Sequence, residues 1–311
     1  MSALSFTALG IDVGGTKIGA GAVSFPEGCI RAKRVIPTLP ARGGEAVLSD
    51  VVRLAEELLA QTRSAGLILE GLGLGLCELV DPTGRILSAN CVRWLDQPVR
   101  ERLSHLGPIT MEADVRAAAL AEALFGAGKP FQTFLYVTVG TGISCCLVLA
   151  GKPFAGARGA TGTMGSSPFS VPCEKCGHIS RLALEEIASG PALVARYNVR
   201  RPARASSARD VLAAASLGDA DAIAVVDSAG EALGASVGLL INVLDPEALI
   251  IGGGLGLSGG PYWDGFVAST RRHIWSGVNR ELPILRAATG LDAGWIGAAA
   301  AVWRKASGAR T

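Results

Sequence analysis

LGIDVGGTKIGAGAV, residues 9–23, is the stretch that decides the fold of this chain. The apolar run at residues 6–13 predicts a buried strand, and the run at residues 18–25 predicts a second strand directly after it. Gly14 and Gly15 lie between the two runs, where we expect a tight turn with positive φ angles. The stretch is therefore predicted to form a β-hairpin closed by glycines.

This glycine turn is a candidate phosphate site. No side chain would cover its backbone N–H groups, and a cluster of such groups binds phosphate. Thr16 adds a hydroxyl group, Lys17 adds a positive charge, and Asp12 could hold Mg²⁺ directly or through water. The pattern is not a Walker loop, because Lys17 follows the glycines too soon and precedes a strand. The alternative is an ordinary hairpin with a solvated lysine.

Length and composition narrow the possible functions. A chain of 311 residues can form two domains with a large core, and its net charge of +2 argues against nucleic acid or a membrane as main partner. We find no apolar run of transmembrane length and no signal sequence, so we expect a cytoplasmic protein. The seven cysteines, an odd number, do not suggest a disulfide framework.

The opening pattern recurs in the middle of the chain, where two expected strands flank Gly140, Thr141 and Gly142. Two strand–turn–strand units predict a duplicated α/β architecture with two lobes. Strands are expected at 29–36, 72–76, 109–112, 134–139, 143–149, 248–251 and 283–287. Helices are expected at 45–64, 114–125, 180–188, 191–197, 208–215, 219–243, 262–274 and 293–305.

Two further glycine turns are candidate nucleotide contacts. The turn at 140–142 could bind the far phosphates of the nucleotide that the first turn holds. Gly252, Gly253 and Gly254 follow another strand, and their backbone could approach a flat group such as adenosine. Each turn alone could equally be an ordinary connection.

Asp114 is the candidate catalytic base. A carboxylate can accept the proton of an alcohol while Mg²⁺ and N–H groups hold the γ-phosphate. Asp12 and Asp114 both come at strand ends, the usual mouth of an open α/β sheet. The alternative is that Asp114 only caps its helix.

Cys173, Cys176 and His178 have the spacing of zinc ligands, although no fourth ligand is visible nearby. Such a zinc would be structural. The alternative is two unligated cysteines in a loop.

Together these motifs resemble the ROK family, which comprises repressors, open reading frames and sugar kinases within the actin-like ATPase superfamily. The resemblance runs nearly end to end. Its motifs are DVGGTK at 12–17, VDPTG at 80–84, AAALAE at 117–122, VTVGTG at 137–142, GKP at 151–153, GARGATG at 156–162, Glu185 with ASG at 188–190, and IGGG at 251–254. The repressor branch is not expected, because no helix-turn-helix segment precedes the first strand.

The resemblance implies a two-lobed actin-like (ribonuclease H-like) fold with a cleft between the lobes. The first lobe would span 1–115 with the helix at 294–311 packed back on it, and the second would span 116–293. The implied activity is transfer of the ATP γ-phosphate to the 6-hydroxyl of a hexose, with Asp114 as base. The glycine turns would bind ATP, and a homodimer is expected.

The chain departs from the family pattern at the sugar-reading positions. Ala113 and Arg116 replace asparagines beside the base, Thr163 and Ser166 replace a glutamate and a histidine, and Cys77-Glu78 replaces Pro-Gly. Ala183 also stands where the family has a zinc ligand, with Cys173 as a possible substitute.

Among the family's sugar ligands, Glu185 remains. A pocket that loses polar ligands should bind plain glucose poorly. Glu78 with Glu185 would suit an ammonium group, which points to an amino sugar such as kanosamine and to antibiotic biosynthesis, whereas Arg116 would oppose it. The alternatives are an ordinary glucokinase, a 7-kinase of a C7 cyclitol, and a non-catalytic sugar sensor. A filament-forming or chaperone-like ATPase is a further class.

Overall fold

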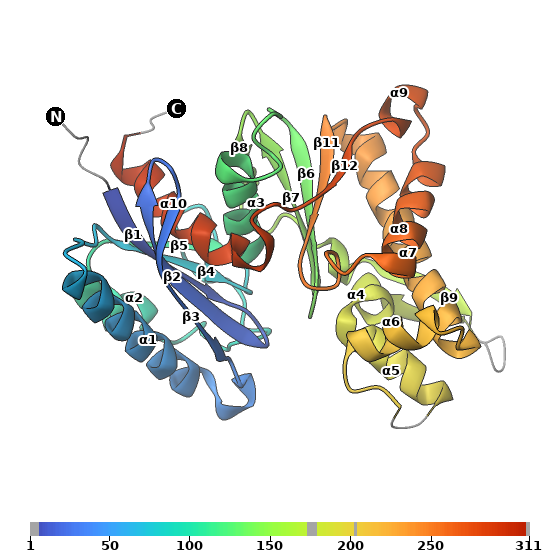
Figure 1. The fold of residues 1–311 in the computed structure, drawn as a ribbon, viewed down its shortest axis with the longest axis horizontal. Coiled ribbons are helices and arrows are strands. Elements are labelled where there is room, and N and C mark those ends of the chain that lie inside the picture. Colours follow the sequence, from blue (N-terminus) through green and yellow to red (C-terminus); the bar gives the residue numbers. More distant parts are fainter. Residues whose placement is uncertain (1–5, 173–178, 202–203, 309–311) are drawn as a thin grey trace. The chain divides into compact units, whose positions relative to one another are not determined.

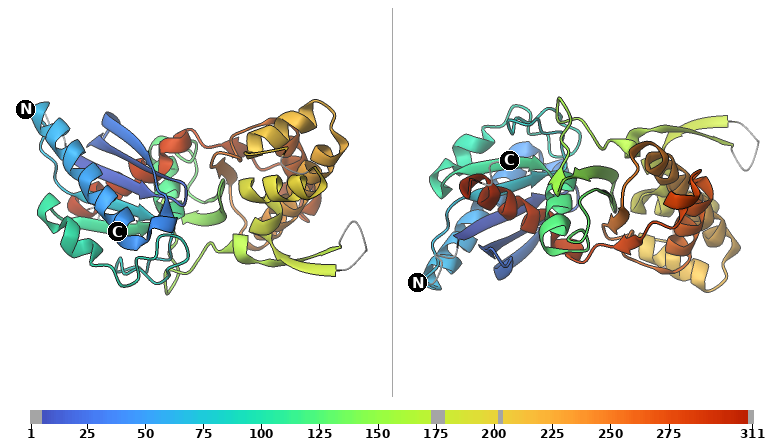
Figure 2. Two further views of the ribbon diagram at one scale, coloured as in Figure 1. Left: turned by 90° about the horizontal axis from the view of Figure 1, so that it is seen from below. Right: turned by 90° about the horizontal axis from the view of Figure 1, so that it is seen from above.

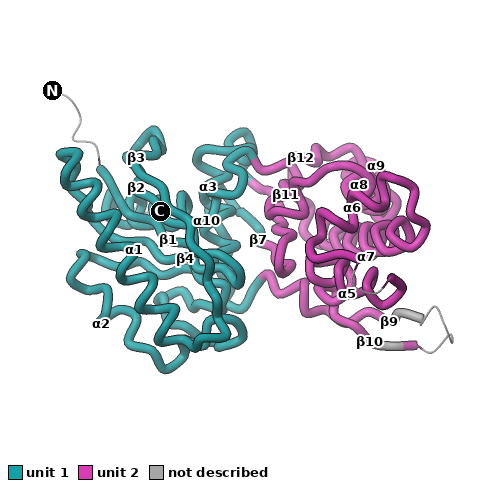
Figure 3. Tube along the Cα trace, turned by 60° about the horizontal axis from the view of Figure 1, so that its bottom comes forward, with its two compact units in different colours: residues 1–132, 146–161, 288–311 teal, residues 133–145, 162–287 magenta. Residues whose placement is uncertain are grey.

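The computed structural model describes residues 6–172, 179–201 and 204–308. The chain forms two compact units (Figure 3): unit 1 comprises residues 1–132, 146–161 and 288–311, and unit 2 comprises residues 133–145 and 162–287. These units differ from the lobes expected from the sequence, because residues 116–132, 146–161 and 288–293 belong to unit 1.

Unit 1 is built on a five-stranded sheet of order β3-β2-β1-β4-β5 (Figure 1). The predicted hairpin is confirmed, since β1 (Phe6–Val13) pairs antiparallel with β2 (Lys17–Phe25), which pairs with β3 (Cys29–Pro37). On the other side of β1, β4 (Leu72–Leu76) and β5 (Ile109–Ala113) run parallel to it. The carboxyl ends of β1, β4 and β5 therefore lie at one edge of the sheet.

Helices cover both faces of this sheet. Leu9, Ile11 and Val13 share a core cluster with the apolar residues of α1 (Gly44–Ser64). The alternate residues of β1 face α10 (Ala293–Ala306), which also packs against α3 (Asp114–Phe125). Short elements complete the unit: η1 (Pro40–Arg42), α2 (Val99–Leu103), η2 (Ser104–Leu106), β8 (Lys152–Pro153) and η4 (Gly290–Asp292).

Glycines let α10 lie unusually close to the sheet. A Cβ atom added to Gly10 would lie 1.8 Å from the Trp295 carbonyl oxygen, and one added to Gly73 would lie 1.8 Å from the Ala298 carbonyl oxygen. Gly21 has no room either, because a Cβ there would lie 2.6 Å from the Trp295 ring. Several glycines of the opening stretch therefore serve helix packing and not the turn.

Unit 2 contains β6 (Phe134–Val139), β11 (Ala248–Gly252) and β12 (Ile284–Arg286), which pair in parallel, and the start of β7 (Ile143–Leu149). Six of its helices share one apolar core with these strands. They are η3 (Met164–Ser166), α4 (Leu184–Ala188), α5 (Gly190–Arg200), α6 (Ala208–Ser216), α7 (Ala220–Leu244) and α8 (Gly260–His273). The short helix α9 (Gly277–Arg280) has no buried residue and does not contribute to this core.

The helix predicted at 180–188 is wrong in its first half. Residues Ile179–Ala183 form strand β10, which pairs antiparallel with β9 (Pro168–Pro172), and only Leu184–Ala188 is helical (Figure 2, yellow-green ribbons). Pairing with β9 overrides the local helical pattern, since a partner strand satisfies the backbone groups of residues 179–183.

Helix α7 is long and apolar enough to cross a membrane by length and composition alone, contrary to the expectation that no apolar run reaches that length. Its buried residues, which include Val225, Leu233 and Ile241, belong to the core of unit 2. Its apolar character is therefore explained by packing inside this unit.

Candidate active site

The structure brings Asp12 and Asp114 together at the carboxyl edge of the unit 1 sheet. Asp12 stands near the end of β1 opposite Gly75 of β4, and Asp114 follows the end of β5. A Cβ atom added to Gly75 would lie 3.6 Å from Asp12 Oδ1 and 3.7 Å from Asp114 Cα. Asp12 and Asp114 therefore both lie beside Gly75, and the charge of Asp114 acts on Asp12.

Asp12 has the features of a cation ligand. Its Oδ1 atom is buried and has no hydrogen-bond partner among the residues that the structure describes. Burial, and then the charge of Asp114, raise the pKa of Asp12 to about 7, although Lys17 lowers it. A metal ion can stabilise a buried carboxylate oxygen that has no hydrogen-bond donor. Asp12 therefore fits the role of a Mg²⁺ ligand, and a bound nucleotide would supply further ligands to the ion.

Gly294 of α10 places the Asp12 carboxyl group. A Cβ atom at position 294 would lie 2.2 Å from Asp12 Oδ2, so any larger residue would displace the carboxylate. The first turn of α10 therefore lies against Asp12, where the positive end of the helix dipole favours a negative charge.

Asp114 has the features of a base. It is the first residue of α3 and its Oδ1 accepts a hydrogen bond from the Val115 N–H at 2.6 Å. Burial raises its pKa to about 6, while the Val115 N–H and the Arg116 charge lower the pKa and Glu78 raises it. A carboxylate that is ionised at neutral pH yet close to accepting a proton suits general base catalysis.

The first glycine turn, residues 14–16, is held by two hydrogen bonds to Gly14. The Gly14 N–H donates to the Lys17 carbonyl at 3.1 Å, and the buried Thr38 hydroxyl donates to the Gly14 carbonyl at 2.7 Å. The expectation of positive φ at Gly14 and Gly15 is wrong, because neither residue has it. Among the described residues the Gly15 N–H has no partner, which leaves it for a ligand.

The second glycine turn, residues 140–142, lies in unit 2 and is supported by Glu185. The Gly140 N–H donates to the Gly142 carbonyl at 2.9 Å, and the Gly190 N–H donates to the Gly140 carbonyl at 2.9 Å. Glu185 Oε2 accepts a hydrogen bond from the Ile143 N–H at 2.8 Å. A Cβ atom added to Gly142 would lie 2.6 Å from the same oxygen. Glu185 therefore shapes this turn directly.

The third glycine turn lies beside the second within unit 2. A Cβ atom at Gly140 would lie 3.7 Å from the Gly254 nitrogen. Gly253 has a φ of +80°, and a Cβ there would lie 2.4 Å from the Val139 carbonyl oxygen, so the position requires glycine. The two turns thus form one backbone surface, as a bound nucleotide would need.

Glu78 has a different environment from the one expected. Its carboxylate is buried and accepts from the Ser88 hydroxyl at 2.5 Å and from the N–H groups of Asn90 at 2.9 Å, Cys91 at 2.6 Å and Val92 at 2.9 Å. Burial raises its pKa, but these donors outweigh burial and hold the pKa below its usual value. Glu78 fixes the loop at 88–92, so the reason to assign it a sugar ammonium group disappears.

The Arg116 side chain also makes its hydrogen bonds within the protein. It is 2% exposed, and its Nε donates to Glu112 Oε1 at 2.5 Å. Its other nitrogens donate to the Gly159 carbonyl at 3.1 Å and to the Val80 carbonyl. Arg116 thereby ties the loop at 156–162 to the segment after β4, which is a different role from the expected contact with the acceptor.

The other expected acceptor residues lie in both units. Ala113 ends β5 beside Asp114 in unit 1. Thr163 and Ser166 are exposed at η3 in unit 2, where a Cβ on Gly165 would lie 3.3 Å from Glu185 Oε2. The expected zinc ligands Cys173, Cys176 and His178 lie outside the described residues. In the part of the chain that is described, no group of three or more His, Cys, Asp and Glu side chains could hold a metal.

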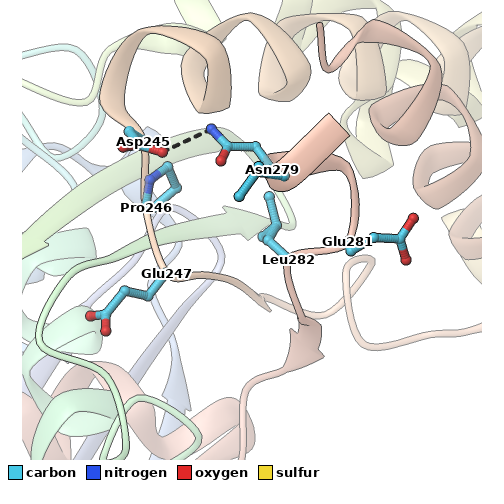
Figure 4. Close-up of a pocket in the computed structure, with 7 residues that line it drawn as sticks. Asp245, Pro246, Glu247, Asn279, Glu281 and Leu282 are labelled. Carbon is cyan, nitrogen blue, oxygen red and sulfur yellow. Dashed lines mark hydrogen bonds between the residues drawn. The ribbon is translucent and has the colours of Figure 1, made fainter. Parts of the chain in front are cut away.

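A separate hollow in unit 2 contains none of the expected site residues. Its volume is about 330 Å³, and Figure 4 shows Asn279 pointing toward Asp245, with which it makes a 2.8 Å hydrogen bond. It carries three carboxylates, from Asp245, Glu247 and Glu281. An acidic surface of this kind does not favour a phosphate group.

The family model for the ROK family matches residues 8–305. The chain belongs to the ROK family. It is 30% identical to the glucokinase of Halalkalibacterium halodurans over 93% of this chain and 92% of the relative. It is also 30% identical to the N-acetylmannosamine kinase of Yersinia pseudotuberculosis, over 96% and 98% of the two chains.

Solved structures of ROK proteins have the same fold. The ROK family glucokinase of Streptomyces griseus, in complex with glucose and AMPPNP, aligns with a TM-score of 0.79 at 28% identity, over 95% of this chain and 98% of that one. The predicted α/β fold of the ROK family is therefore confirmed.

Sequence reasoning missed the residues that place the site. Gly75, Gly294 and Thr38 do so from β4, α10 and the segment after β3. The sequence signal for Gly294 was the high share of glycine and alanine at 293–300, which is typical of a closely packed helix but does not identify its partner.

Proposed function

We propose that this ROK sugar kinase transfers the γ-phosphoryl group of ATP to the 6-hydroxyl of a neutral hexose, with Asp114 as the general base. The observation that carries the proposal is the position of Asp114: it follows a strand end, lies beside Gly75 together with Asp12, and has a pKa raised to about 6. The relatives named glucokinase and N-acetylmannosamine kinase support the reaction class.

Each residue has a distinct part in this reaction. Asp114 accepts the proton of the attacking hydroxyl, which makes the oxygen a better nucleophile. Asp12 would hold Mg²⁺ directly or through water, and a bound ion would supply positive charge against the phosphate groups. Gly15 and the turns at 140–142 and 252–254 contribute backbone contacts to the nucleotide, and Lys17 contributes positive charge.

A neutral acceptor fits the charges better than an amino sugar does. Of the three charged residues considered for an ammonium group, Glu78 and Arg116 use their hydrogen-bonding atoms inside the fold, which leaves Glu185 without the second carboxylate. Glu185 keeps one carboxylate oxygen besides the one that accepts from the Ile143 N–H, and that oxygen can accept from a sugar hydroxyl.

The experiment is an acceptor panel with ATP and Mg²⁺. Glucose, N-acetylmannosamine, N-acetylglucosamine, kanosamine and a C7 cyclitol are compared by kcat/KM, and NMR identifies the phosphorylated oxygen. We expect a neutral hexose or N-acetylhexosamine to be best and to be modified at the 6-hydroxyl. A clear preference for kanosamine would reject the neutral acceptor, and no turnover with any sugar would reject the kinase in favour of a sensor.

Two expectations outside the described geometry belong to the same proposal. A structural zinc at Cys173, Cys176 and His178 is checked by metal analysis of the purified protein. A homodimer is checked by light scattering of the eluted protein.

A further inference from the structure

Two cysteines meet at the edge of the sheet that carries Asp12 and Asp114. Cys77 directly follows β4, and its N–H donates to the Val13 carbonyl at 3.1 Å. The Cys77 thiol has the Cys91 side chain as its hydrogen-bond partner and also interacts with the charge of Asp114. A pair of thiols in contact with each other thus lies near the proposed base.

The fold holds this pair together through Glu78. Glu78 follows Cys77 in the chain, and its Oε1 atom accepts from the Cys91 N–H at 2.6 Å and the Val92 N–H at 2.9 Å. Both cysteines are half-buried, pack against the same apolar cluster, and are not in a disulfide. The buried Glu78 carboxylate therefore holds the backbone at position 91 close to the segment that carries Cys77.

We propose that Cys77 and Cys91 form a reversible disulfide, a modification site that switches off phosphoryl transfer. The oxidant is a small-molecule disulfide. One cysteine thiolate attacks it and releases one thiol, and the second cysteine then displaces the other thiol. One S–S bond forms between Cys77 and Cys91, one S–S bond of the oxidant breaks, and the two cysteine protons end on the two released thiols.

The bond would alter the surroundings of Asp114. A disulfide holds its sulfur atoms about 2.05 Å apart, much closer than two thiols in a hydrogen bond. Closing that distance pulls the Cys77 side chain and the 88–92 loop together next to the base. Small displacements at a reacting centre cost large factors in rate, so the oxidised form should be inactive. This consequence rests on the proposed kinase function.

The reaction is slow at neutral pH. Hydrogen bonding to Cys91 and burial, with the nearby carboxylates, raise the pKa of the Cys77 thiol well above its ordinary value. A protonated thiol is a poor nucleophile, so the protein is incubated with oxidant for hours.

The test uses glutathione disulfide as the probe. The full chain carries Cys29→Ser, so that this exposed thiol cannot react, and it keeps Cys173 and Cys176, which are proposed zinc ligands. The mass of the linked peptide distinguishes a Cys77–Cys91 bond from any bond through those two cysteines. We expect a peptide linked through Cys77 and Cys91 in the mass spectrum and an activity loss of at least about tenfold. Dithiothreitol should restore the activity. Adding Cys91→Ser should leave the basal activity and abolish both the linked peptide and the loss.

The two claims fail separately. The linked peptide is measured without activity, so a protein that is no kinase can still show the disulfide. Absence of the linked peptide overturns the proposed modification site. A linked peptide with unchanged activity, or equal inactivation of the Cys91→Ser protein, overturns the switch. Cys91→Ala serves as a second variant if Cys91→Ser does not fold.

Discussion

The two glycine turns look alike in sequence but are supported differently. In unit 1, the Gly14 carbonyl is satisfied by a hydroxyl, that of Thr38, at 2.7 Å. In unit 2, the Gly140 carbonyl is satisfied by a backbone N–H, that of Gly190, at 2.9 Å. A carboxylate accompanies each turn, but Asp12 keeps a buried oxygen without a partner among the described residues whereas Glu185 binds the Ile143 N–H.

This difference distinguishes a carboxylate that can bind a ligand, Asp12, from one that stabilises the backbone of its own turn, Glu185. An unpaired buried carboxylate oxygen is costly and persists where a ligand compensates it, so the first turn is where we place the metal. A carboxylate that satisfies its own turn stabilises the backbone without that cost. One of the two turns thus lies beside a carboxylate with an unpaired oxygen, and the other lies beside a carboxylate that binds its own turn.

Among the variants that test this comparison, the largest effect should come from Gly294→Ala, which disturbs the carboxylate beside the first turn. The added methyl would lie 2.2 Å from Asp12 Oδ2, so Asp12 must move. We expect kcat to fall about 10²-fold and the free energy of unfolding to fall by about 1–3 kcal/mol. Gly265→Ala in α8 is the matched control, because a methyl there meets nothing within 4 Å and should leave both quantities nearly unchanged. Equal behaviour of the two variants would contradict the placement of Asp12.

Acid should remove activity through Asp114. The base must be ionised to accept a proton, and its pKa is raised to about 6, so kcat/KM should fall about tenfold per unit as pH drops below about 6. A pH profile with thermal stability recorded at each pH separates titration from unfolding. Constant kcat/KM down to pH 5 in folded protein would argue against this base.

A smaller effect should distinguish the two supports. Thr38→Val removes the hydroxyl that donates to the Gly14 carbonyl, and Glu185→Ala removes the acceptor of the Ile143 N–H. Each leaves a backbone group unpaired at about 1 kcal/mol, so KM for ATP should rise about fivefold in both. Only Glu185→Ala should also raise KM for the sugar. An equal rise of KM for the sugar in Thr38→Val would show that the two turns do not have distinct roles.

The smallest effect is on stability. The pKa of Asp12 is raised in the folded state, so its ionisation opposes folding, and this loss sets in as pH rises through about 4 to 7. Asp12→Asn removes that charge and should raise Tm by about 2–4 °C at pH 8 without Mg²⁺, with no gain at pH 4. Calorimetry at both pH values checks this. A lower Tm at pH 8 would mean that the carboxylate is satisfied after all.

The sequence predicts what is local and misses what depends on packing. Alternating apolar runs and a glycine turn are enough for the hairpin, because register follows from the pattern within one segment. The strand at 179–183 was missed since its partner strand overrides its helical pattern. The sequence also does not predict the roles of Glu78 and Arg116. A charged residue near a site suggests a ligand contact, because its hydrogen-bond partners are distant in the sequence. Those partners lie in the 88–92 loop for Glu78 and in the 156–162 loop for Arg116.

The central claim is that Asp114 takes the proton of the acceptor hydroxyl. The direct measurement is single-turnover phosphoryl transfer by Asp114→Asn at saturating ATP and hexose, with ATP affinity measured separately by calorimetry. The account predicts a rate about 10³-fold lower than wild type, with ATP affinity changed less than about twofold. Transfer within about tenfold of wild type would contradict it.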